Sequence, residues 1–89
     1  MSSKNLKSII ESLLFVSGEP LKIAKIAKIC SVSKDDIANE IEALNRDYKE
    51  EDRGLTVIQK DDSVQLATNP NNSEMVSQLV SGELESGLS

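Results

Sequence analysis

The first part of the chain carries a helical pattern of apolar residues. They recur at positions i, i+3, i+4, i+7 and i+8, namely Leu6, Ile9, Ile10, Leu13 and Leu14. This spacing predicts a helix with one buried stripe, which Gly18 and Pro20 bring to an end. At roughly 100° per residue, Phe15 lies about 180° from that stripe. We therefore expect Phe15 to be covered either by a later element or by another chain.

A second helical pattern follows in the segment LKIAKIAKIC, residues 21–30. We expect this helix to begin at Glu19 and Pro20, because Pro is tolerated at the first helical position, where its missing N–H has no partner to lose. The residues predicted to face inward are Ile23, Ile26, Ala27 and Cys30. Lys22, Lys25 and Lys28 recur on the outside as a basic strip, which we interpret as a solvated face.

Ser33 is in place to cap a third helix, with Asp35 and Asp36 in its first turn, where the helix dipole favours negative charge. The apolar residues of this helix are spaced by four, three and four positions, namely Ile37, Ile41, Leu44 and Tyr48. This amphipathic stripe predicts a helix that ends near residues 49–52.

After Gly54 the apolar pattern changes from helical to alternating. Leu55 and Val57 share one face of LTVIQK, while Val64 and Leu66 share one face of SVQLAT. The Asp61-Asp62 pair between these segments is typical of a turn, so we predict a β-hairpin.

The run from Asn69 to Asn72 ends the hairpin, and we expect Ser73 to cap a short last helix. The apolar residues of that helix are Met75, Val76, Leu79 and Val80. Two helices joined by a short turn, followed by a hairpin, are the elements of a winged helix. The predicted fold is therefore α+β, with a winged-helix domain over residues 1–80 and a linker or tail over residues 81–89.

Composition narrows the possible functions. The 89 residues include no His and one Cys, and the net charge is −5. Without His, zinc sites and Ser-His or Cys-His catalysis are not expected, and Cys30 has no partner for an intrachain disulfide. We expect no cofactor and no catalytic residue. No signal-peptide pattern and no long apolar run occurs, so we predict a cytoplasmic protein without a membrane partner.

Charge also weighs against DNA as the main partner. Residues 34–52, which hold the helix expected to read DNA, carry three basic and eight acidic residues. Asp61 and Asp62 would face phosphates at the tip of the wing, with Lys60 as the neighbouring cation. Strong DNA binding is therefore not expected, although a winged-helix DNA-binding transcription regulator stays the alternative function. The two Asp pairs are better explained as helix-cap and turn residues than as a catalytic dyad or a metal site.

Surface for binding another protein is the remaining candidate site. Phe15 lies off the main stripe of its helix, Ile29 lies beyond the inward face of the second helix, and Ile58 lies opposite Leu55 and Val57 on its strand. Packing in a secondary core is the alternative explanation for each of these residues.

The sequence resembles the N-terminal winged-helix domain of the segregation and condensation protein B family over about residues 6–80. The segments that carry the likeness are Leu13-Leu14-Phe15, Gly18-Glu19-Pro20-Leu21, Gly54-Leu55 and QLATNP, residues 65–70. The resemblance implies a non-enzymatic subunit of the bacterial chromosome-condensing complex, with a second winged-helix domain after the linker.

The same resemblance implies two protein partners. One is a second copy of this chain, bound through this first domain. The other is the kleisin subunit, segregation and condensation protein A, which bridges the ATPase heads of the structural maintenance of chromosomes (SMC) protein. The resemblance makes Phe15 and its helix neighbours candidate dimer contacts. The candidate dimer or partner interface as a whole comprises Leu14, Phe15, Ile29 and Ile58.

Overall fold

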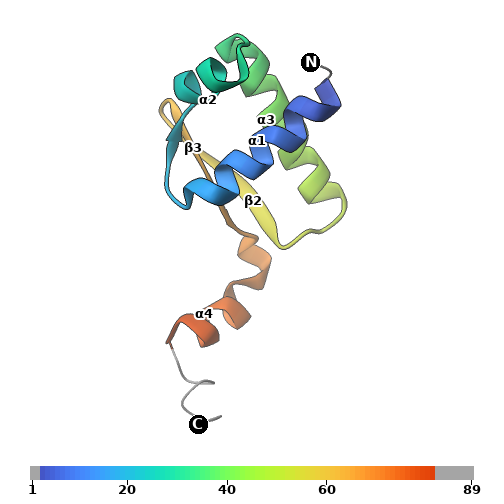
Figure 1. Cartoon of the computed structure of the whole chain (residues 1–89). Helices are drawn as coiled ribbons and strands as arrows, with labels where there is room; N and C mark the ends of the chain where they lie inside the picture. Colours follow the sequence, from blue (N-terminus) through green and yellow to red (C-terminus); the bar gives the residue numbers. More distant parts are fainter. Residues whose placement is uncertain (1–2, 82–89) are drawn as a thin grey trace.

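The computed structural model describes residues 3–81 of the chain (Figure 1). Its elements in chain order are helix α1 (Ser3–Ser17), strand β1 (Leu21–Lys22), helix α2 (Ile23–Cys30), helix α3 (Lys34–Glu50), strands β2 (Leu55–Lys60) and β3 (Ser63–Thr68), the 3₁₀ turn η1 (Pro70–Asn72) and helix α4 (Ser73–Ser81). The predicted order of three helices, a hairpin and a short helix is present. The predicted tail over residues 81–89 lies, apart from Ser81, outside the described residues.

The sheet is antiparallel, with strand order β1-β3-β2. Within the hairpin, Val57 is paired with Leu66, and Asp61 and Asp62 form the turn as predicted. Asp61 has a φ of 55°, a left-handed conformation that Asp tolerates better than most residues.

The expected start of the second helix at Glu19 and Pro20 is wrong. Leu21 and Lys22 form strand β1 instead, with Leu21 opposite Val64 of β3, and α2 begins at Ile23. The backbone N–H of Ile23 donates to the carbonyl of Asp62 at 2.8 Å, which joins the start of α2 to the tip of the hairpin. The backbone groups of this segment are thus paired with the sheet rather than with a helical turn.

The start of the third helix is as predicted. The Ser33 hydroxyl accepts a hydrogen bond from the backbone N–H of Asp36 at 3.0 Å, and both Asp35 and Asp36 lie in the first turn of α3. The core between α1, α2, α3 and the inner face of the sheet is almost entirely aliphatic, with one aromatic ring. Its buried members are Leu6, Ile10, Leu14, Ile23, Ile26, Ala27, Cys30, Ile37, Ile41, Leu44, Tyr48, Val57 and Val64.

Helix α3 is joined to α1 by polar contacts at the edge of this core. The Tyr48 hydroxyl donates to the carboxylate of Glu11, and the Lys7 ammonium pairs with the carboxylate of Asp47. Burial of the phenol, together with its hydrogen bond to Glu11, raises the pKa of Tyr48 well above its ordinary value.

Asn45 joins α3 to the outer edge of the sheet. Its side-chain oxygen accepts from the backbone N–H of Val57 at 2.7 Å, and its side-chain NH₂ donates to the carbonyl of Val57 at 2.9 Å. An amide side chain therefore pairs with both backbone groups of an edge-strand residue. This pairing covers part of an edge that could otherwise pair with another strand.

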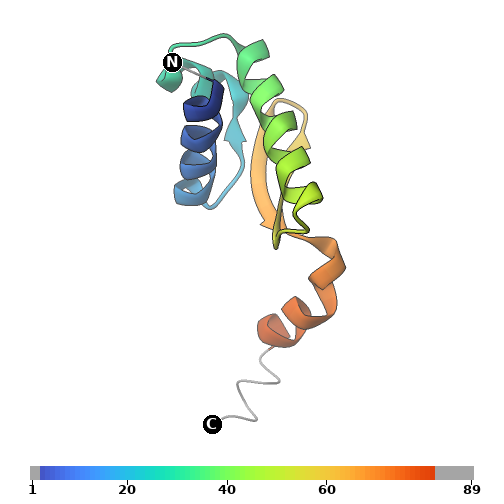
Figure 2. The ribbon, with the colours of Figure 1, turned by 90° about the vertical axis from the view of Figure 1, so that its right-hand side faces the viewer.

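Helix α4 extends away from the body beyond the open end of the hairpin (Figures 1 and 2). Its predicted cap is wrong, because Ser73 has helical dihedrals and belongs to α4 itself. Asn69 caps the preceding turn instead, with its side-chain oxygen accepting from the N–H of Asn71 at 2.9 Å. None of the residues of α4 is buried.

The raised pKa of Tyr48 leads to a prediction for alkaline pH. Because the folded state holds the phenol proton more tightly than the unfolded state, its contribution to stability is complete below pH 10 and declines as the pH rises above that value. Tyr48 is the only Tyr and the chain has no Trp, so tyrosinate absorbance reports on this residue alone. The Tyr48 phenol should ionise at higher pH in the native chain than in the chain unfolded in urea. Glu11→Gln should reduce the difference between these two titration midpoints. Coincident titration curves for native and unfolded chains would contradict the buried hydrogen bond.

Candidate protein-binding surface

An exposed apolar patch lies where the last turn of α1 meets the open end of the hairpin. Its residues, called here the α1–hairpin patch, are Phe15, Val16, Leu55 and Leu66. Phe15 is 75% exposed, Val16 82% and Leu55 37%, and Leu66 is partly buried. All four line a groove of about 340 Å³ together with Glu11 and Ser12. An adjoining hollow of about 200 Å³ shares Phe15, Leu55 and Leu66 and extends to Gly18 and Thr68.

Helix geometry explains why this patch exists. Residues 13–16 are four consecutive apolar residues, and one helical stripe cannot bury all four, because successive side chains are about 100° apart. Leu14 points into the core and is only 2% exposed, which leaves Phe15 and Val16 on the outside. The expectation that Phe15 points away from the buried stripe is confirmed. Leu14 as a contact for another chain needs correction, because its side chain already packs inside its own domain.

The other two predicted contacts lie on different surfaces. Ile58 is 52% exposed and, because side chains alternate along a strand, lies on the face of β2 opposite Leu55 and Val57. It lines a third hollow, of about 310 Å³, beside Pro20 and the tip of the hairpin. Ile29 is 54% exposed on α2. The structure therefore does not gather Phe15, Ile29 and Ile58 into one patch.

Helix α4 forms a second exposed apolar surface that the sequence pattern did not reveal. Met75, Leu79 and Val80, called here the α4 face, are all exposed and lie within a sector about 140° wide. Their helical spacing predicted a short helix, and apolar stripes of this kind usually pack on the body of a globular protein. The structure places the stripe in solvent.

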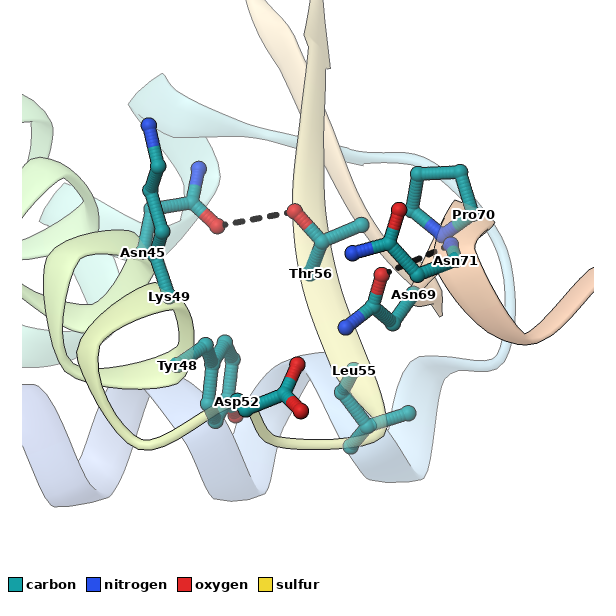
Figure 3. Close-up of a pocket in the computed structure, with 9 residues that line it drawn as sticks. All are labelled: Asn45, Tyr48, Lys49, Asp52, Leu55, Thr56, Asn69, Pro70 and Asn71. Atoms are coloured by element: carbon teal, nitrogen blue, oxygen red, sulfur yellow. Dashed lines mark hydrogen bonds between the residues drawn. The ribbon is translucent and has the colours of Figure 1, made fainter.

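Another hollow at this end of the molecule is lined mostly by residues with polar side chains (Figure 3). It measures about 400 Å³ and is lined by Asn45, Tyr48, Lys49, Asp52, Leu55, Thr56, Asn69, Pro70 and Asn71. Two of its amide side chains make hydrogen bonds within the fold. Asn45 accepts from the Thr56 hydroxyl at 3.2 Å, and Asn69 accepts from the backbone N–H of Asn71 (Figure 3). We interpret this hollow as the joint between α3, the hairpin and η1 rather than as a reactive site.

Acidic residues are exposed where a DNA-binding winged helix needs positive charge. Asp35, Asp36, Glu42 and Glu50 of α3 all face solvent, as do Asp61 and Asp62 at the hairpin tip. Such a surface repels the phosphates whose neutralisation supplies most non-specific affinity for DNA. The geometry therefore favours binding of protein over binding of nucleic acid.

The described range, residues 3–81, has neither a candidate metal cluster nor a candidate membrane-spanning helix. Within that range, no three His, Cys, Asp or Glu side chains are grouped so that they could hold a metal ion. Over the same range, no helix has the length and apolarity needed to cross a membrane.

Comparison with known proteins finds matches to one protein family. Residues 8–89 match the family model described as "Segregation and condensation complex subunit ScpB". A segregation and condensation protein B from Clostridium botulinum is 40% identical over 90 residues, a match that covers 100% of this chain and 47% of the relative. The chain thus spans about half the length of the curated relatives it matches.

Solved structures agree with this match. A crystal structure described as a dimer of ScpB N-terminal domain complexed with ScpA peptide is 31% identical, with a TM-score of 0.78 over 85% of this chain and 95% of that chain. ScpB from Mycobacterium tuberculosis shares the fold, with a TM-score of 0.84 over 94% of this chain and 52% of that chain, at 17% identity. The predicted α+β winged-helix class and the predicted family resemblance are both confirmed.

The contrast between Leu14 and Phe15 can be tested by a pair of substitutions. Leu14→Ala removes a buried side chain and should lower the free energy of unfolding by about 2–5 kcal/mol. Phe15→Ala removes an exposed side chain and should change that free energy by no more than about 0.5 kcal/mol. Urea unfolding, at a protein concentration low enough to keep the chain monomeric, measures the free energy of unfolding of both variants. Equal losses for the two variants would contradict the orientation of α1.

Proposed function

The chain belongs to the segregation and condensation complex subunit ScpB family, and from that premise we propose that it is the N-terminal domain of a non-enzymatic subunit of a bacterial chromosome-condensing complex. We propose that it forms a homodimer and binds the kleisin ScpA, and through ScpA is linked to the SMC ATPase heads. In this proposal residues 1–80 are the winged-helix domain and residues 81–89 begin the linker to a second domain. The protein then acts in the cytoplasm, at the nucleoid.

One observation carries the proposal. A domain with this fold has exposed apolar side chains on two separate regions, at the end of α1 and on the outer face of the hairpin, while its α3 surface is acidic. The relative with 31% identity, described as a dimer complexed with an ScpA peptide, has two protein contacts at once. Two contacts made simultaneously need two surfaces, and this chain has them.

We assign the dimer contact to Phe15 and the α1–hairpin patch. We assign the kleisin contact to the hollow around Ile58, because Ile58 lies on the face of β2 opposite Leu55 and no residue of the α1–hairpin patch lines this hollow. Ile58 in that hollow is suited to anchor an apolar side chain of a peptide, with Lys60 and Asp62 at the rim. Ile29 stays a prediction for an additional partner contact.

The alternative of a DNA-binding regulator is weaker on the same observations. A backbone binder needs Lys and Arg along the surface that meets DNA, and here that surface carries the acidic side chains of α3. A mobility-shift titration on random duplex at low salt should show no binding. A salt-dependent shift would favour the regulator.

Kleisin binding can be tested by a calorimetric titration of the chain with a peptide from the middle of ScpA of the same organism. We expect 1:1 or 2:1 binding, and we expect Ile58→Ser to weaken it about tenfold or more because an anchor in a hollow is lost. Gln59→Ser is the matched control, because Gln59 is the exposed neighbour on the opposite strand face. The same titration with Ile29→Ser decides whether α2 joins the contact.

Two results would contradict the proposal. If the unaltered chain does not bind the peptide, this domain by itself does not bind the kleisin. Equal weakening by Ile58→Ser and Gln59→Ser would place the contact elsewhere.

A further inference from the structure

Two exposed apolar surfaces of this chain lie near the same end of the molecule, and each has the shape that the other would fit. The α1–hairpin patch is concave, because its residues line a groove of about 340 Å³ with an adjoining hollow of about 200 Å³. The α4 face is convex, being a stripe of Met75, Leu79 and Val80 on a helix. A helix laid in an apolar groove is a common mode of protein recognition, with anchors one helical turn apart, as Met75 and Leu79 are.

Helix α4 has little to stabilise it in the single chain. It has nine residues, and none is buried. Isolated helices of fewer than about 12 residues are marginal in water, and most helices in proteins owe their stability to packing of an apolar face. A helix with this composition therefore needs a surface on which to lay Met75, Leu79 and Val80.

The structure directs α4 away from its own groove. Asn69 holds the exit from β3, because its backbone N–H donates to the carbonyl of Gly54 at 2.8 Å and its side-chain NH₂ donates to the carbonyl of Arg53 at 2.9 Å. Its side-chain oxygen caps η1, whose first residue, Pro70, fixes the backbone. Both views show α4 leading off the end of the hairpin rather than back across α1 (Figures 1 and 2).

We propose that α4 of one copy docks in the α1–hairpin groove of a second copy, and that the second copy returns the same contact. This inference rests on the proposed dimer and specifies how its surfaces meet. A reciprocal contact is the natural form of a two-fold dimer, in which surface i meets surface j twice.

The charges at the two surfaces fit this occupant. Helix α4 carries one acidic residue, Glu74, in its first turn, and no basic residue in its last turn. The charged residue that lines the groove is Glu11, whose carboxylate is engaged by the Tyr48 hydroxyl. Apart from Glu74 at its start, the helix that enters the groove is uncharged, and the carboxylate of Glu11 already has a partner within its own domain.

Complementation between two variants tests the reciprocal contact. Phe15→Ser removes an apolar side chain from the groove, and Leu79→Ser removes one from the α4 face. Both side chains are exposed, so both variants should still fold. Each variant alone loses both contacts of its homodimer. If each contact contributes about tenfold to the dimer affinity, the variant dimer should be roughly 100-fold weaker than the unaltered dimer.

In an equimolar mixture, a mixed dimer keeps one intact contact, between the α4 of the Phe15→Ser chain and the groove of the Leu79→Ser chain. That mixed dimer should form about tenfold more tightly than either variant dimer. Sedimentation velocity over a concentration series measures all three dimers. Gln59→Ser is the control that should leave dimerisation unchanged, because Gln59 is exposed and lines neither the groove nor the adjoining hollow.

Each other outcome overturns the inference in a recognisable way. If Phe15→Ser weakens the dimer and Leu79→Ser does not, the patches meet each other rather than α4. If both variants weaken it and the mixture recovers nothing, α4 does not enter the groove of the second copy. If neither variant weakens a dimer that does form, dimerisation stands and uses another surface. An unaltered chain that stays monomeric removes the proposed dimer itself, together with this inference.

Discussion

Packing of the α1 stripe against α3 and the inner face of the hairpin determines where the other apolar side chains of α1 point. Ile10 and Leu14 of that stripe are almost completely buried, and their position fixes the rotation of the whole helix. With Leu14 inside, Phe15 and Val16 must lie outside, and they do so next to Leu55 and Leu66 at the open end of the hairpin. The surface that we assign to self-association is thus a consequence of how the core is filled.

Polar contacts around this core join the helices to one another and to the sheet. Tyr48 and Glu11 join α3 to α1, and Asn45 joins α3 to the edge of β2. An aliphatic core with a polar seam of this kind is suited to hold two binding surfaces in a fixed relation. The acidic exterior of α3 supports the same conclusion, because it disfavours the nucleic-acid contact for which winged helices are often used.

Much of the fold was predictable, because helical spacing and strand alternation are local properties. The stripe of α3, its Ser33 cap and the Asp61-Asp62 turn each depend on a few neighbouring residues. Strand β1 was missed because its two residues become a strand only when β3 lies beside them. The contacts of Asn69 with Gly54 and Arg53 could not be predicted, because the fold brings these residues together from a distance. Its cap contact with Asn71 is local, and the sequence pattern placed the cap at Ser73 instead.

The candidate surface was predictable only in part, for a related reason. The angular position of Phe15 followed from helix geometry, and the four-residue apolar run that includes Val16 was a signal that one stripe could not bury everything. Ile58 followed from strand alternation. By contrast, the contribution of Leu55 and Leu66 to the groove needed the hairpin to be placed against α1. The exposure of α4 could not be predicted, because an apolar stripe has the same sequence spacing whether its helix is packed on the domain or exposed.

Hydrogen exchange of backbone amides across a dilution series tests most directly whether the exposed apolar surfaces serve a second copy of this chain. If they do, amides of α4 and of the strand segment around Leu55 exchange more slowly at high protein concentration than after dilution, while those of α2 are unchanged. Exchange rates that do not depend on concentration anywhere along α4 and the α1–hairpin patch would contradict that role.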